Sequence, residues 1–173
     1  MLAEQTMGAE RQLDPQDLGD HIDRLYRAAR SLTGSREEAE DLVQETFVRV
    51  LQKPRLLCSN DDLGYLLRVL RNTFISMRRT ASRRPQVGAP PEVLEFVEDR
   101  AAVQPQTQVE LGEVYSAIAE LPPDFRDAVM AIDVVGLSYR EAAKALGVRE
   151  ATITTRLHRG RQRLALGLSG NDA

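Results

Sequence analysis

The stretch GLSYREAAKALGVREATITTRLHRGRQRL, residues 136–164, decides the fold of the C-terminal half of this chain. Ser138 and Glu141 have the capping-box spacing, in which the two residues satisfy each other's backbone N–H groups at the start of a helix. Gly147 can then adopt the left-handed backbone of a tight turn, and a longer helical pattern follows. A short helix, a turn and a longer helix in this order predict a helix-turn-helix.

The longer helix of this pattern has one apolar and one polar face. Its apolar positions recur in steps of four, three and four residues, which at about 100° per residue form one inward stripe: Ile153, Leu157, Gly160 and Leu164. Its outward positions carry hydroxyl, imidazole and guanidinium groups, which can reach base edges in a major groove: Thr154, Thr155, His158 and Arg159. The flanking cations suit phosphate contacts: Arg149, Arg156, Arg161 and Arg163. A solvated basic face is the alternative interpretation.

The N-terminal half contains three further helical patterns. The first runs from about Asp14 to Leu32 and ends at Gly34, and the second starts at Ser35 and continues to about Gln52. The third spans about residues 61–79. Aromatic residues make up only 5% of the chain, and most apolar positions are Leu, Val or Ala. This composition favours helices packed on helices, so we expect an all-α fold.

Charge alternates along the chain. Residues 68–84 hold six arginines and no acidic residue, residues 92–124 are acidic, and residues 140–163 are basic again. Prolines and Gly88 interrupt any helix between Arg84 and about Gln106, which indicates a linker. With 173 residues, the chain has room for two small helical domains. We therefore expect a domain at 1–84, an acidic linker at 85–106 and a second domain at 107–173.

Several function classes are disfavoured. No apolar run is long enough to cross a bilayer, so we expect a cytoplasmic protein without membrane insertion. Cys58 is the single cysteine and has no partner for a disulfide or zinc site. Two histidines and scattered carboxylates show no metal-ligand spacing, catalytic triad or phosphate-binding glycine loop. We expect no catalytic residue, no metal and no cofactor.

Four stretches in one order resemble the extracytoplasmic-function sigma factors, group 4 of the sigma-70 family. They lie at 39–48, 65–73, 121–143 and 157–161. The first resembles the helix that docks on the clamp coiled coil of the largest subunit of core RNA polymerase, which implies polymerase contacts by Asp41, Gln44, Glu45, Phe47 and Val48. The last two resemble the minus-35 domain, and this resemblance adds Thr152 to the DNA-contacting residues named above.

The second stretch resembles the segment that opens and reads the minus-10 element. Asn72 matches a position that contacts an extruded base, where an amide suits a Watson–Crick edge. The neighbouring arginines would hold the separated strand: Arg68, Arg71, Arg78 and Arg79. Tyr65 replaces the family's usual Trp, and Thr154 replaces a usual cation, so the promoter sequence does not follow from the resemblance.

The resemblance implies three partners: core RNA polymerase, promoter DNA and an anti-sigma factor. It also implies nucleoid association of the polymerase-bound protein. Two rival interpretations remain open. In one, the chain is a transcriptional regulator that uses only its helix-turn-helix. In the other, it is a helical adaptor that binds protein alone, and its arginine clusters only keep it soluble.

Overall fold

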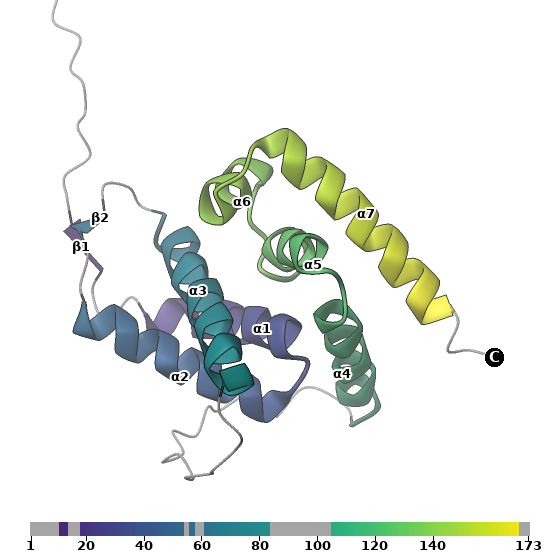
Figure 1. Cartoon of the computed structure of the whole chain (residues 1–173), viewed down its shortest axis with the longest axis horizontal. Helices are drawn as coiled ribbons and strands as arrows, with labels where there is room; N and C mark the ends of the chain where they lie inside the picture. The colour runs from purple at the N-terminus through teal and green to yellow at the C-terminus, as the bar shows by residue number, and fades with distance from the viewer. Residues whose placement is uncertain (1–10, 14–17, 54–55, 58–60, 84–104, 170–173) are drawn as a thin grey trace, which may run out of the picture.

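The computed structural model describes residues 11–13, 18–53, 56–57, 61–83 and 105–169 (Figure 1). The described residues are almost entirely helical, which confirms the all-α class. One short antiparallel pair, β1 (Arg11–Gln12) with β2 (Leu56–Leu57), was not predicted. The helices are α1 (Ile22–Thr33), α2 (Arg36–Gln52), α3 (Asp62–Arg83), α4 (Pro105–Ala119), α5 (Pro123–Val129), α6 (Tyr139–Leu146) and α7 (Glu150–Ser169).

Helices α1, α2 and α3 form a three-helix unit in the N-terminal half. A short 3-10 turn, Gly19–His21, leads into α1, and Gly34 ends that helix with a positive φ of 72°. The Ser35 hydroxyl caps α2 by accepting a hydrogen bond from the Glu38 N–H at 3.4 Å. The predicted start of the first helix at Asp14 lies outside the described residues, and the α-helix itself begins later than predicted, at Ile22, after the 3-10 turn.

The C-terminal half contains the predicted helix-turn-helix. The Ser138 hydroxyl accepts from the Glu141 N–H at 3.2 Å, and the Glu141 carboxylate accepts from the Ser138 N–H at 2.8 Å, which completes the capping box of α6. These hydrogen bonds lower the pKa of Glu141. Gly147 has φ of 68°, a left-handed backbone that favours glycine, and turns the chain from α6 into α7. The predicted motif is therefore confirmed.

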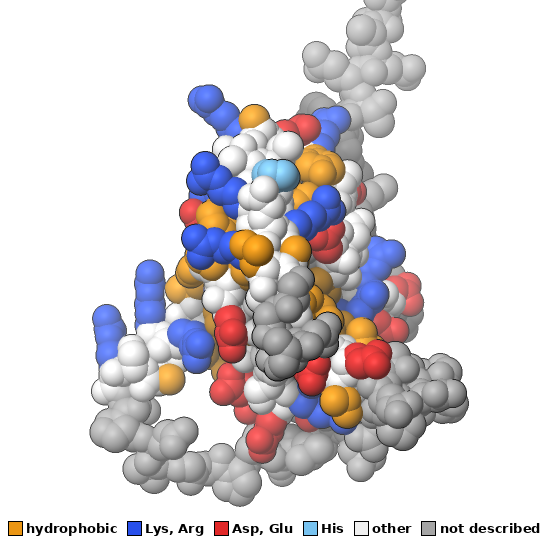
Figure 2. All heavy atoms as spheres, turned by 90° about the vertical axis from the view of Figure 1, so that its right-hand side faces the viewer, with side chains coloured by type: hydrophobic (Ala, Val, Ile, Leu, Met, Phe, Trp, Pro, Cys, Tyr) orange, Lys and Arg blue, Asp and Glu red, His pale blue; other side chains and the backbone are white. Residues whose placement is uncertain are grey.

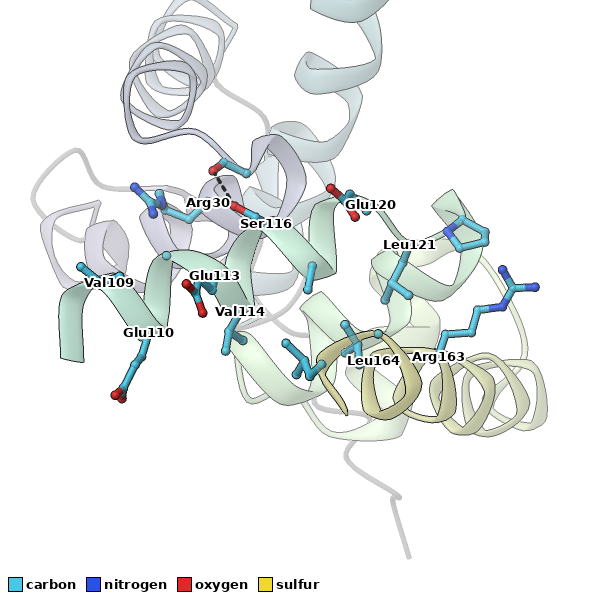
Figure 3. A pocket seen from close by; sticks show the side chains of 16 residues that line it. Arg30, Val109, Glu110, Glu113, Val114, Ser116, Glu120, Leu121, Arg163 and Leu164 are labelled. Carbon is cyan, nitrogen blue, oxygen red and sulfur yellow. Dashed lines mark hydrogen bonds between the residues drawn. The ribbon is translucent and has the colours of Figure 1, made fainter. Parts of the chain in front are cut away.

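Helix α4 was not predicted from the sequence. It begins at Pro105, where the missing N–H of proline is tolerated because first-turn N–H groups have no partner within the helix. Its main neighbour is α1 of the other half. The Ser116 hydroxyl donates to the Gly34 carbonyl at 3.5 Å (Figure 3). The Arg30 guanidinium lies 5.4 Å from the Tyr115 ring centroid. Residues 85–104 of the predicted linker lie outside the described part, and the prediction is wrong for its last two residues, 105–106, which begin α4.

The two halves share one hydrophobic core. Met130 and Ala131, in a π-helical turn that follows α5, are fully buried in the same cluster as Leu25 and Leu66 of the N-terminal half. This turn contacts α1, while α6 contacts α3. Since buried apolar area is the main stabilising term in folding, these contacts hold the two halves together in the described structure.

Gly160 of α7 lies where two helices approach most closely. A Cβ atom at this position would be 2.7 Å from Val129 Cγ2 and 3.3 Å from the Phe125 carbonyl oxygen of α5. Such distances leave no room for a methyl group, so the glycine permits the contact between α5 and α7. Gly167, near the end of the same helix, is surrounded by open space, and a Cβ atom there would have no neighbour within 4 Å.

We expect Gly160→Ala and Gly167→Ala to change stability in opposite directions. Alanine gains about 1 kcal/mol of helix propensity at an interior position, but overpacking at Gly160 costs roughly 1–3 kcal/mol. Gly160→Ala should therefore lower the free energy of unfolding, and Gly167→Ala should raise it by up to about 1 kcal/mol. Urea unfolding followed by circular dichroism measures both. Equal stabilisation by the two changes would contradict the close approach.

Candidate nucleic-acid interface

The outward face of α7 carries the polar side chains that the sequence predicted. Ile153 and Leu157 are buried beneath it, and basic side chains gather around a histidine on this side of the molecule (Figure 2). The Thr154 and Thr155 hydroxyls each donate to the backbone carbonyl four residues earlier, at 3.2 and 3.1 Å. Their oxygen lone pairs remain available to accept hydrogen bonds. Exposed residues of this face include Arg149, Thr154, Thr155, His158 and Arg159.

Three of the predicted phosphate-contacting arginines have partners within the C-terminal half. Arg161 donates to both oxygens of Asp133, at 3.0 and 2.5 Å, and these hydrogen bonds together with the carboxylate charge raise its pKa. Arg156 donates to Asp124 at 2.9 Å, and Arg163 lies 5.3 Å from the Phe125 ring centroid. The contacts with Asp133, Asp124 and Phe125 orient the three arginines while leaving Arg161 and Arg163 exposed.

Thr152, also predicted to contact DNA, is half-buried at the start of α7.

Helix α3 carries the residues predicted for the minus-10 contact. Leu66, Leu67 and Leu70 are fully buried, whereas Asn72 is exposed. Arg78 and Arg79 are also exposed near the end of the helix, and the Arg78 guanidinium lies 5.6 Å from the Phe74 ring centroid. The helix therefore presents an amide and two cations to solvent.

Arg68 and Arg71 of α3 instead contact the C-terminal half. Arg71 donates to Asp127 of α5 at 2.5 Å, and Arg68 donates to the carbonyl oxygens of Lys144 and Ala145 at 2.6 and 3.3 Å. The acceptors of Arg68 lie at the C-terminal end of α6, where the helix dipole is negative. The structure thus separates these two arginines from the other residues predicted for the minus-10 contact.

The predicted polymerase-binding residues lie along one side of α2, with one exception. Asp41, Gln44 and Glu45 are half-buried, and Val48 is 44% exposed on the same helix face. Phe47 instead packs against the core, as its partly buried side chain indicates. Glu45 pairs with Arg49 at 2.8 Å. The face is acidic at one end and apolar at the other.

Sequence reasoning missed two features of these surfaces. Leu51 is 53% exposed and continues the apolar end of the α2 face. Because residues three apart in a helix lie on the same face, its spacing from Val48 could have predicted this position. The buried pair Arg126 and Asp127 gave no signal, since adjacent charges in a helix usually face solvent. Among the described residues, no cluster of His, Cys, Asp or Glu could hold a metal ion, and no helix is long and apolar enough to span a membrane.

The family comparisons match both halves of the chain. Residues 18–84 match the family model for sigma-70 region 2, and residues 111–164 match the family model for sigma-70, region 4. The first range contains α1 to α3, and the second contains the helix-turn-helix.

Curated relatives agree with these matches. The ECF RNA polymerase sigma factor SigE of Mycolicibacterium smegmatis is 41% identical over 83% of this chain, which spans 57% of that relative's length. The ECF RNA polymerase sigma factor SigM of Bacillus subtilis is 31% identical, over 83% of this chain and 88% of the relative.

Solved structures share the fold. The sigma factor RpoE of Bartonella quintana, in complex with the anti-sigma factor NepR, is 27% identical with a TM-score of 0.66, covering 89% of this chain and 95% of that chain. CnrH, in complex with the cytosolic domain of CnrY, is 25% identical with a TM-score of 0.63, and the match covers 90% of this chain and 86% of that chain. With both sigma-70 regions matched in order and curated relatives in agreement, the chain belongs to the extracytoplasmic-function RNA polymerase sigma factors.

Proposed function

We propose that this chain binds core RNA polymerase through α2, reads minus-35 duplex through α7 and contacts the melted minus-10 strand through α3. The observation that carries the proposal is that one chain presents two exposed polar, arginine-bearing helix faces, on α3 and α7, together with an acidic and apolar face on α2. A regulator that used only its helix-turn-helix would need neither the arginine-bearing face of α3 nor the acidic and apolar face of α2.

The chemistry of the α7 face supports duplex reading. Hydroxyls that donate to their own helix present acceptor lone pairs, which suit the amino groups of cytosine and adenine. His158 and Arg159 add donors beside them. Exposed cations at Arg149, Arg161 and Arg163 then supply the phosphate contacts that set the register of the helix in the groove. The Asp133 contact fixes the direction in which the Arg161 guanidinium points.

The exposed end of α3 supports contact with a separated strand. Asn72 offers both a donor and an acceptor to an extruded base, and Arg78 and Arg79 offer charge to the backbone. Phe74 is 6% exposed, so no aromatic ring at that position is open to stack with a base. Strand capture in this proposal depends on hydrogen bonding and charge.

The α2 face is proposed as the polymerase contact. Val48 and Leu51 provide apolar area that water would otherwise cover, and Asp41 with Gln44 provides polar contacts around it. Glu45 forms an ion pair with Arg49, so we place it in the polar rim around the apolar centre of this contact. Phe47 contributes indirectly, because it packs against the core and holds α2 in position.

The remaining assignments follow from family membership. We propose that the polymerase performs the chemistry and that this chain acts as a recognition subunit in the cytoplasm, at the nucleoid when bound to polymerase. The solved structures include the sigma factor RpoE with the anti-sigma factor NepR, and CnrH with the cytosolic domain of CnrY. We propose that this chain also has an anti-sigma partner.

Run-off transcription tests the proposed function. Purified core polymerase would be given a pool of templates with randomised minus-35 and minus-10 elements, with and without the chain. Each template would carry a transcribed tag that identifies its promoter, and we expect the transcribed templates to be enriched in two sequence elements only when the chain is present. Equal transcription in its absence, or enrichment of a single element, would reject the two-element assignment.

Changes on the α2 face should weaken polymerase binding. Replacing an apolar interface residue or a contacting carboxylate commonly costs about 1–3 kcal/mol, so Val48→Asp and Asp41→Ala should each raise the dissociation constant for core polymerase at least about fivefold. Asp23→Ala, which removes an exposed carboxylate from α1, is the control and should have no effect. Surface plasmon resonance with immobilised core polymerase measures the three variants.

Two changes on α7 should affect DNA binding in different ways. Arg149→Ala should weaken binding to all duplexes alike and reduce the slope of log K against log salt by about one, since a phosphate contact is lost. His158→Ala should relax sequence preference at one position by about 1–3 kcal/mol while leaving the salt slope unchanged. Gln162→Ala is the exposed control on the same helix. Fluorescence anisotropy at several salt concentrations distinguishes the two effects.

A further inference from the structure

Two arginines of the proposed strand-binding helix are occupied by the other half of the chain. Arg71 of α3 donates to Asp127 of α5, 56 residues away in sequence, and Arg68 donates to two carbonyls at the end of α6. Lys144 of α6 lies 3.5 Å from Asp61, which precedes α3. Polar contacts therefore join α3 and the residue before it to α5 and α6.

The centre of this contact is a single buried carboxylate among several guanidinium groups. Asp127 is 3% exposed. Arg71 reaches it from α3, and Arg126, which is 9% exposed, lies 3.6 Å from its other oxygen. The Arg126 guanidinium also lies 5.0 Å from the Phe74 ring centroid of α3. Asp127 is therefore the carboxylate that neutralises cations from both halves.

The pKa of Arg126 is lowered, which reflects the free-energy cost of burying its positive charge. Burial lowers its pKa, the neighbouring Asp127 raises it, and the positive charges of Arg78 and Arg71 lower it further. Without the Asp127 charge, the closed arrangement would bury a cation against other cations. A buried charge that loses its partner strongly destabilises the structure around it. Separation of the two halves would relieve this penalty by returning Arg71 and Arg126 to water.

We propose that Asp127 is an electrostatic latch that holds the two halves closed and competes with single-stranded DNA for Arg71. The proposal rests on the proposed strand-binding role of α3. A phosphodiester offers the same acceptor chemistry as the Asp127 carboxylate, an anionic oxygen that accepts from a guanidinium. In the closed chain Arg71 is engaged by Asp127 and Arg68 by α6, so the minus-10 surface is incomplete. In the open chain both arginines join Asn72, Arg78 and Arg79.

The latch reduces the apparent affinity of the free chain for a separated strand. If only a fraction of molecules is open, the apparent dissociation constant rises by the inverse of that fraction. A chain that is open about one tenth of the time therefore binds roughly tenfold more weakly than a permanently open one. The apolar contacts of Met130 and Ala131 with the N-terminal half favour the closed state. The Asp127 carboxylate favours it further, because it neutralises Arg71 and Arg126, which would otherwise repel each other.

Fluorescence energy transfer tests the latch without using DNA or polymerase. Dyes would be attached at Glu37→Cys on α2 and Gln162→Cys on α7, both exposed, in a Cys58→Ser background. Asp127→Asn keeps the side-chain shape and removes the charge, and we expect it to lower the transfer efficiency. Asp124→Asn is the matched control, because this exposed carboxylate on the same helix pairs with Arg156 inside the C-terminal half. Unchanged transfer in Asp127→Asn, with helical content retained by circular dichroism, overturns the proposal.

A second measurement tests the competition. We expect a mixed-sequence, single-stranded DNA oligonucleotide to lower the transfer efficiency of the labelled wild-type chain, and Asp127→Asn to bind that oligonucleotide about tenfold more tightly. Opening without tighter binding would overturn the competition for Arg71. Run-off transcription by the wild-type chain is read separately, so failure of the proposed function there would leave the energy-transfer result standing.

Discussion

The arrangement of the whole chain depends on what α5 and the turn after it present to the N-terminal helices. Arg126 and Asp127 lie in the last turn of α5 and contact α3, and Met130 and Ala131 begin the turn after α5, which contacts α1. The π-helical turn, with its hydrogen bond from the Val135 N–H to the Met130 carbonyl at 3.0 Å, continues the backbone while setting the direction of these side chains. Buried charge and buried apolar area therefore meet in one short segment.

Charge distribution explains how a chain with a net charge of -3 can be suited to DNA. Arginines outnumber acidic residues on α3 and α7, and several of the carboxylates that balance them sit on α5 and the turn after it: Asp124, Asp127 and Asp133. Asp124 and Asp133 hold Arg156 and Arg161 in fixed directions, which lowers the entropy lost when these arginines bind another partner. Of the three carboxylates, Asp127 alone pairs with an arginine of the other half, and it is also the most deeply buried.

Close packing against α5, together with the Arg156–Asp124 and Arg161–Asp133 ion pairs, sets the position of α7. Gly160 allows α7 to approach α5 at Phe125 and Val129, and Ile153 with Leu157 anchors the same face. Because the inward stripe is fixed, the outward residues on the opposite face of α7 are fixed with it. A site built on a packed helix holds its side chains more precisely than a loop does.

The sequence by itself determined the helical class, the capping box of α6, the turn at Gly147 and the two faces of α7, because these depend on spacing within a few residues. It did not reveal α4, which follows a proline-rich stretch, or the shared core of the two halves. Only the tertiary structure decided which arginines are engaged. The acceptors of Arg71, Arg156 and Arg161 lie 56, 32 and 28 residues away, and no local pattern specifies a contact that exists only once the helices have packed.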